Sequence, residues 1–185
     1  MQLILVLETR SSCNSDYRYI KATIDYYYKQ RTFNINPIYA KTKSELVKQD
    51  KRVQEEINRY NGYSKVVLCA DYDSDSSPEN IVIVEYCKKH DYELIWMNTN
   101  IEHVYLNKPN VDDKDKESRN FLRKSKIILK NLQNLHNLEP LDKPCSSNIL
   151  VVLDKYLERK WHKNYIYVNN GGRSIYEIGK ISNWK

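Results

Sequence analysis

The sequence is poor in the residues that mark low-complexity chains, since only 4 of its 185 residues are glycine and 5 are proline. Its 4 cysteines form no CxxC pair, and neither they nor the 4 histidines have the spacing of zinc ligands. These absences argue against a disordered chain and against a zinc cluster. Cys69 lies in an apolar run and Cys87 in a helical pattern, so we expect reduced, mostly structural thiols.

Long apolar runs are absent as well. The run LILVL, Leu3–Leu7, is too short for the core of a signal peptide and follows no basic residue, and no run reaches the length of a membrane span. The sequence therefore predicts a cytoplasmic protein without a membrane partner. A Walker loop and a GxGxxG turn are missing too, so neither motif supports nucleotide binding.

The chain does contain enough apolar residues for a sizeable core, because 41% of it is hydrophobic. Its formal net charge is +6, its sequence pI is about 9.0, and it has 16 tyrosines. Two interpretations of the charge stay open. Nucleic acid, DNA or RNA, is one candidate partner of a basic protein. A lysine-rich surface that keeps the protein soluble is the other.

Strand and helix patterns alternate up to residue 98. Apolar or alternating runs predict strands at residues 3–7, 32–40, 65–70 and 92–98. Apolar residues at helical spacing lie between these strands, from Tyr17 to Tyr27, from Leu46 to Tyr60 and from Ile81 to Cys87. Pro37 indicates an edge strand, and Pro78 marks the start of a helix. This order predicts an α/β fold with an open, mainly parallel, Rossmann-like sheet and helices on both faces.

The second half of the chain has a different pattern. We expect a polar loop at 108–118, a helix with an apolar stripe from Phe121 to Leu135, and a helix at 149–159. A β-hairpin around Asn170–Gly172 is expected near the end. The chain thus divides into an α/β core, a helical extension packed on that core, and a hairpin tail, at residues 1–107, 108–160 and 161–185.

Acidic residues follow three of the predicted strands, namely Glu8, Asp71, Asp73, Asp75 and Glu102. Ligands of open parallel sheets bind beyond the carboxyl ends of the strands. Carboxylates gathered there need a compensating charge, and hard oxygen ligands suit Mg²⁺ or Mn²⁺. The sequence therefore predicts a Mg²⁺ or Mn²⁺ site whose candidate ligands are Glu8, Asp71, Asp73 and Asp75. Glu8 is alternatively a general acid/base.

Structural explanations of these acids also stay open. Asp75 lies just before Pro78 and equally fits the cap of the next helix. Many strands end in a polar residue, so Glu8 gains weight only from its pairing with Asp71 and Asp73.

A glutamate after the first strand and a D-x-D pair, Asp71 and Asp73, after the third occur in this order in Toprim domains. The chain resembles more specifically the RloB-like family of the Toprim superfamily, over residues 1–158. Four stretches carry the resemblance: LILVLETRSSCNSDYRYIK, VVLCADYDSD, MNTNIEHVYL and KPCSSNILVVLDKYL. Thr9 stands where the family usually has glycine, and NTNIE lacks the family's proline.

The resemblance implies a Toprim-like fold and phosphodiester hydrolysis of nucleic acid in a bacterial or phage-defence system. It also implies a general acid/base role for Glu8, metal binding by Asp71 and Asp73, and an assisting role for Glu102. A partner ATPase or another defence-system protein is a further candidate partner. Because Thr9 replaces the family's glycine, a second hypothesis remains, a non-catalytic module that binds nucleic acid or a protein.

Basic residues support a nucleic-acid partner. Residues 114–130 contain many more lysines and arginines than acids, and Arg159 and Lys160 stand next to Trp161. Such mixtures suit phosphate contact and base stacking. The predicted nucleic-acid contacts are Arg10, Arg119, Arg123, Lys126, Lys130, Arg159 and Lys160. The structural alternatives are a solvated helix face and a tail that Trp161 holds in place.

Overall fold

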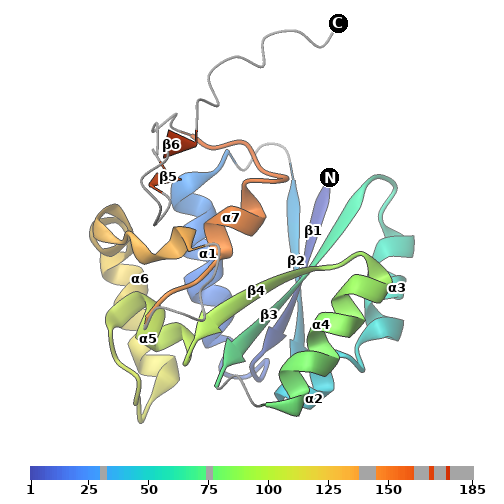
Figure 1. The fold of residues 1–185 in the computed structure, drawn as a ribbon, viewed down its shortest axis with the longest axis horizontal. Helices are drawn as coiled ribbons and strands as arrows, with labels where there is room; N and C mark the ends of the chain where they lie inside the picture. The colour runs from blue at the N-terminus through green and yellow to red at the C-terminus, as the bar shows by residue number, and fades with distance from the viewer. Residues whose placement is uncertain (30–32, 74–76, 138–144, 161–166, 169–173, 176–185) are drawn as a thin grey trace, which may run out of the picture.

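The centre of the fold is a sheet of four parallel strands (Figure 1). The computed structural model describes residues 1–29, 33–73, 77–137 and 145–160, and the backbone of 167–168 and 174–175. The strands are β1 (Gln2–Glu8), β2 (Asn34–Ala40), β3 (Ser64–Tyr72) and β4 (Glu93–Asn98), in the order β2-β1-β3-β4. This is the open parallel sheet that the alternating patterns predicted.

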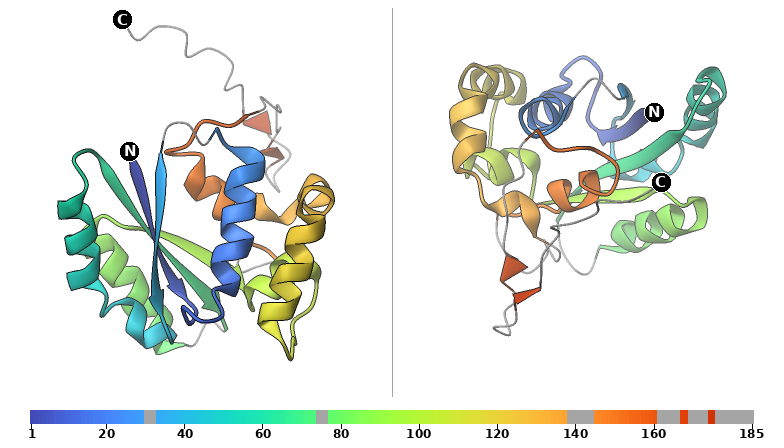
Figure 2. Two further views of the ribbon diagram at one scale, coloured as in Figure 1. Left: turned by 180° about the vertical axis from the view of Figure 1, so that it is seen from behind. Right: turned by 90° about the horizontal axis from the view of Figure 1, so that it is seen from above.

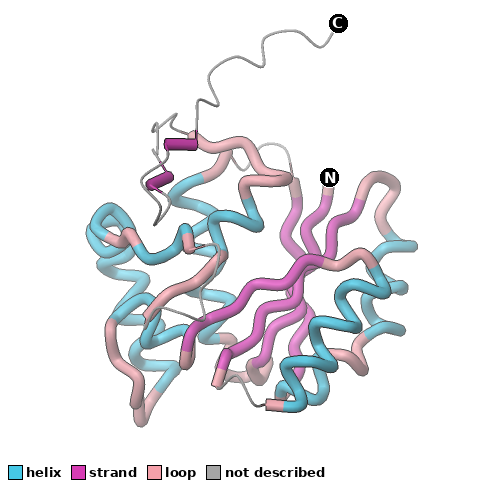
Figure 3. The backbone as a smooth tube through the Cα atoms, in the orientation of Figure 1, coloured by secondary structure: helices cyan, strands magenta, loops and turns pink. Residues whose placement is uncertain are grey.

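Helices cover both faces of the sheet (Figures 1 and 3). The α4 face carries α2 (Lys43–Leu46), α3 (Asp50–Arg59) and α4 (Pro78–His90). The α1 face carries α1 (Ser15–Tyr27), α5 (Ile101–Leu106), α6 (Lys114–Asn131), the 3-10 helix η2 (Asn134–His136) and α7 (Ile149–Leu153). Helices from the predicted extension therefore share one core with the sheet.

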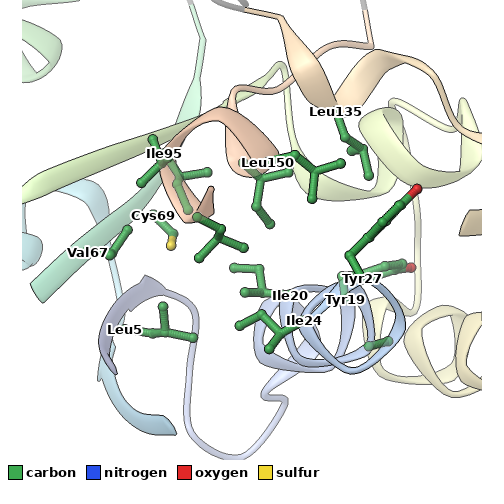
Figure 4. Packing of buried hydrophobic residues seen from close by; sticks show 14 of the residues in the cluster. Leu5, Tyr19, Ile20, Ile24, Tyr27, Val67, Cys69, Ile95, Leu135 and Leu150 are labelled. Carbon is green, nitrogen blue, oxygen red and sulfur yellow. The ribbon is translucent and has the colours of Figure 1, made fainter. Parts of the chain in front are cut away.

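Alternating side chains of the strands supply two separate cores, as the twofold period of a strand requires. Leu5 and Val67 point to the α1 face and pack with Ile20 and Leu150 (Figure 4). The neighbouring residue Val6 belongs instead to the core of the α4 face. Side chains of β1 and β3 are therefore buried on both faces of the sheet, which explains the nearly continuous apolar runs of these strands.

Two proline predictions are confirmed. Pro37 lies in β2, which pairs only with β1 and so forms an edge of the sheet. Edge strands are where proline is tolerated in a sheet, because one side of such a strand pairs with no neighbour. Pro78 is the first residue of α4, where a helix needs no intrahelical donor.

Several element boundaries differ from the prediction. The expected helix from Leu46 to Tyr60 is two helices, α2 and α3, since residues 47–49 are not helical. The expected loop 108–118 already contains the start of α6, because the Asp113 side chain accepts a hydrogen bond from the N–H of Lys116 and caps the helix. The last expected helix ends at Leu153, and the short helix α5 was not predicted.

The buried side of α4 also differs from the expected one. Asn80, Ile83 and Cys87 are buried, whereas Ile81 is 60% exposed. The apolar residues of this helix lie all around it, so their spacing defines no single face.

The tail contains β5 (Tyr167–Val168) and β6 (Ser174–Ile175), which pair antiparallel in agreement with the predicted hairpin. The expected turn at Asn170–Gly172 and the side chain of Trp161 lie outside the described residues. In the part of the chain that the structure describes, no helix has the length and apolar character needed to cross a membrane. All four cysteines are free thiols.

Candidate active site

Strands β1 and β3 bring two of the predicted acids together at the carboxyl edge of the sheet. The two strands pair in parallel, with Leu7 opposite Cys69. The Oε2 atom of Glu8 accepts a hydrogen bond of 3.3 Å from the backbone N–H of Asp71. The predicted proximity of Glu8 and Asp71 is therefore present.

The acids nevertheless divide between the two faces of the sheet. Glu8 follows Val6 in the alternation toward the α4 face, and its charged neighbours include Lys43 and Asp73. Asp71 follows Cys69 toward the α1 face. The acids Asp16 and Glu102 and the base Lys114 are among the charged neighbours of Asp71.

On the α1 face, Asp16, Asp71 and Glu102 form what we call the buried acid cluster. Glu102 is 0% exposed, and neither of its carboxylate oxygens has a hydrogen-bond partner within the described residues. Asp16 is 8% exposed and accepts a hydrogen bond of 2.9 Å from the Ser15 hydroxyl. The nearest cation is Lys114, whose Nζ lies 3.4 Å from Oε2 of Glu102. Lys114 is thus shared by Asp16, Asp71 and Glu102.

Burial and mutual repulsion raise the pKa of Asp16 and Asp71. Burial and then the charge of Asp16 hold the pKa of Asp71 well above its usual range. Burial and then the charge of Glu102 raise the pKa of Asp16 from 3.8 to about 7. The pKa of Glu8 is also raised, chiefly by burial, although the N–H of Asp71 opposes the shift. The site therefore disfavours further negative charge and would be stabilised by a cation.

Asp73 has a different environment. It is 66% exposed, and its Oδ2 atom lies 2.7 Å from the Nζ of Lys43. Lys43 is buried, also donates to Oδ1 of Asn80 at 3.2 Å, and lies 5.9 Å from the centre of the Trp96 ring. The charge of Asp73 is thus already compensated by the protein. Asp75, the remaining predicted ligand, lies outside the described residues.

The chemistry of the edge fits a hard divalent cation. Its oxygens are carboxylates, and those of Glu102 are buried with the Lys114 ammonium 3.4 Å from Oε2. In the described part of the chain, no three His, Cys, Asp or Glu side chains converge on one point as a complete ligand set. Mg²⁺ typically needs only one or two protein carboxylates and completes its shell with water and phosphate. Asp71 is the best placed of the predicted ligands, because it lies among the other acids of the cluster and next to Glu8.

Sequence reasoning missed two members of this site. From the sequence, Asn14, Ser15 or Asp16 could each cap the first helix; Asn14 occupies the cap position with φ 40°, and Asp16 is buried in the first turn of α1. Lys114 was counted only in a basic run. The available signal was their position, since Asp16 follows β1 closely and Lys114 begins the first long helix after Glu102.

His103, next to Glu102 in the chain, contacts a thiol. Its Nε2 atom lies 2.8 Å from the Sγ of Cys145, a residue with a positive φ of 59°. The pKa of the Cys145 thiol is raised by burial, which favours the neutral form. We therefore assign this pair no nucleophilic role.

The predicted basic residues separate into two groups. Lys126, Lys130, Arg159 and Lys160 line a groove of about 840 Å³ between α1 and α6, which lie side by side (Figure 2). Arg119 and Arg123 do not line this groove: Arg119 pairs with Asp115, and Arg123 is exposed. Arg10 is exposed in the turn after β1.

Comparison with known proteins gives no relative, because no family model, no curated protein and no solved structure matches the chain.

Proposed function

We propose that the protein is a Mg²⁺- or Mn²⁺-dependent hydrolase of phosphodiester bonds in nucleic acid. The observation that carries this proposal is the concentration of acids at the carboxyl edge of the sheet. Glu8, Asp16, Asp71 and Glu102 come from four different elements, and three of them have raised pKa values. Charge repulsion of this kind is costly unless a ligand offsets it, so it indicates a functional site.

The residues of this edge suit distinct roles. Asp71 would hold the ion among the acids of the buried acid cluster, and Asp73 would join it by giving up its ion pair with Lys43. A bound Mg²⁺ or Mn²⁺ stabilises negative charge on a phosphoryl oxygen and lowers the pKa of a bound water. Glu8 is suited to move a proton, because burial raises its pKa and the N–H of Asp71 holds its carboxylate in place. Glu102 and Lys114 would set the charge around Asp71.

The resemblance to the RloB-like Toprim family supports the same chemistry and suggests a role in bacterial or phage defence. Its motif residues Glu8, Asp71 and Asp73 end adjacent strands of this sheet or directly follow them. The choice between DNA and RNA and the need for a partner ATPase are left to experiment.

The test is cleavage of plasmid DNA and of single-stranded RNA by the full chain with Mg²⁺, Mn²⁺ or EDTA. We expect products only with a metal, and we expect Asp71→Asn and Asp73→Asn to abolish them while the fold is retained. Glu85→Gln is the matched control, because Glu85 is exposed on α4 away from the edge and should leave the rate unchanged. Cleavage by Asp71→Asn at the wild-type rate with Mg²⁺ would falsify the assigned roles.

A second candidate is a non-catalytic module that binds nucleic acid. The lack of a complete three-residue ligand set among the described residues favours it, as does Thr9 in place of glycine. A salt-sensitive complex with nucleic acid, and no product with either metal, is the result that this candidate predicts.

A further inference from the structure

The groove between α1 and α6 is a defined surface with an apolar floor. The two helices run in the same direction, since Arg18 pairs with Asp115 near their starts and the Tyr27 hydroxyl donates to the carbonyl of Leu129 near their ends, at 2.7 Å. The groove occupies about 840 Å³, and apolar surface predominates in its lining. It is separate from the carboxylates of the proposed active site, none of which line it.

The charge of this groove is strongly positive. Its basic lining residues are Arg18, Lys21, Lys126, Lys130, Arg159 and Lys160. The one carboxylate among its described lining residues, Asp25, is already paired with Lys21 at 2.5 Å. Lys126 and Lys130 are exposed and make no ion pair or hydrogen bond with any described residue. An anionic occupant therefore finds at least two cations that the protein itself does not use.

Aromatic and apolar side chains line the same groove. Tyr17 and Tyr26 are only partly buried and contribute to its wall, and Leu122 is 42% exposed there. Tyrosine rings offer flat faces on which bases stack, and lysines beside them contact phosphates. A single strand presents both groups together, whereas a duplex hides its base faces. The chain's own residues 161–185 are an unsuitable occupant, because they too contain more basic than acidic residues.

The groove also has a fixed relation to the acidic edge. Helix α1 begins beside the buried acid cluster, and Tyr17 and Arg18 of its first turn line the groove. A helix of 13 residues is ~20 Å long, which accommodates a few extended nucleotides. A strand lying along α1 would therefore have one end near the start of this helix, where Asp16 lies.

We propose that the α1–α6 groove binds single-stranded nucleic acid and guides it to the carboxyl edge of the sheet. This proposal names the substrate class of the hydrolysis proposed above and rests on it. Phosphates contact Lys126 and Lys130, and bases stack on Tyr17 and Tyr26.

Fluorescence anisotropy of a labelled single-stranded oligonucleotide, titrated with the full chain in EDTA, tests the groove without hydrolysis. Lys126→Ala/Lys130→Ala should weaken binding about tenfold or more and reduce the slope of log affinity against log salt by about 1.4, or about 0.7 per lost phosphate contact. The matched control is Lys88→Ala/Lys89→Ala, which removes the same charge from exposed positions on α4 and should change affinity less than about twofold. Tyr26→Leu should weaken binding without changing the slope, because it removes stacking and no charge.

The results can separate the two proposals. Binding that depends on the groove lysines, without any metal-dependent product, would contradict the hydrolase proposal and support the groove proposal. If Lys126→Ala/Lys130→Ala binds and cleaves a single strand with the wild-type affinity and rate, the groove proposal is contradicted and the hydrolase proposal is supported. The groove proposal also fails if wild type does not bind, if both lysine pairs weaken binding equally, or if an unlabelled duplex competes as well as a single strand.

Discussion

At the scale of single residues, the two aspartates of the D-x-D pair have opposite environments. Asp71 is enclosed with other acids on the α1 face, whereas Asp73 is largely exposed and paired with Lys43. A buried acid among acids costs stability in the folded chain, and an exposed paired acid costs little. Removing the two charges should therefore have different effects on stability.

Asp71→Asn should stabilise the metal-free protein. The amide has nearly the shape of the carboxyl group and removes the cost of keeping an acid in this cluster. We expect the free energy of unfolding in EDTA at about pH 8 to rise by about 1–3 kcal/mol, measured by urea denaturation. Glu85→Gln should change it by less than about 0.5 kcal/mol. A loss of stability in Asp71→Asn would mean that the carboxylate is a structural hydrogen-bonding group rather than a ligand.

Single residues differ in how well the sequence predicts their place. Glu8 and Asp71 follow apolar strand runs, and the parallel pairing of the two strands brings the ends of these strands together. Asp16 was harder to place, because a polar residue at the start of a helix suggests a cap, whereas the structure has Asn14 at the cap and Asp16 buried. The partner of Asp73 is Lys43, 30 residues away in α2, and nothing local in the sequence links the two.

At the scale of elements, α6 is held to the rest of the molecule through aromatic packing. Phe121 is 1% exposed, with its ring centre 4.5 Å from that of Tyr19 in α1 and 5.4 Å from that of Tyr105 in α5. These contacts join α6, which forms one side of the groove, to α1 and α5, the helices that carry Asp16 and Glu102. The same aromatic packing therefore positions both the groove and the acidic edge.

Phe121→Ala should destabilise the protein by about 3–5 kcal/mol, because it leaves a cavity among three helices. Urea denaturation measures the loss. Ile127→Ala is the control on the same helix, since Ile127 is 69% exposed, and its effect should stay below about 0.5 kcal/mol. Equal losses in the two variants would contradict the packing of α6 described above.

The elements themselves were largely predictable. Buried parallel strands produce apolar runs, and Pro37 and Pro78 restrict the backbone in known ways, so the sheet and the start of α4 followed from local pattern. The start of α6 and the division of α2 from α3 did not. Asp113 begins a helix inside a polar segment, and Leu46 and Val53 fit one helix as well as two.

At the scale of the whole molecule, the protein is basic, yet the negative charge at the acidic edge of its sheet is only partly balanced by nearby bases. The net charge is +6, yet Lys114 is the nearest base to the buried acid cluster. The positive charge is placed instead along the α1–α6 groove. The distribution suits a polyanion and a cation bound at neighbouring sites.

The metal-free protein should lose stability as pH rises from about 5 to about 8. The raised pKa values of Asp16, Asp71 and Glu8 mean that the folded chain keeps protons that the unfolded chain has released. Such groups contribute stability that is complete below the unfolded pKa and is lost as pH rises through the folded pKa. We expect a loss on the order of 2–4 kcal/mol in EDTA, measured by urea denaturation at each pH. A stability that increases over this range would contradict the electrostatic description of the edge.

The central claim, that Asp71 and the acids around it bind a divalent cation, is tested most directly by Mn²⁺ binding. Electron paramagnetic resonance of free Mn²⁺, titrated with the full chain at about pH 8, measures the bound fraction without any substrate. The account predicts one site that Mg²⁺ displaces, with affinity reduced about tenfold or more by Asp71→Asn and unchanged by Glu85→Gln. Absence of binding, or equal binding by wild type and Asp71→Asn, would contradict it.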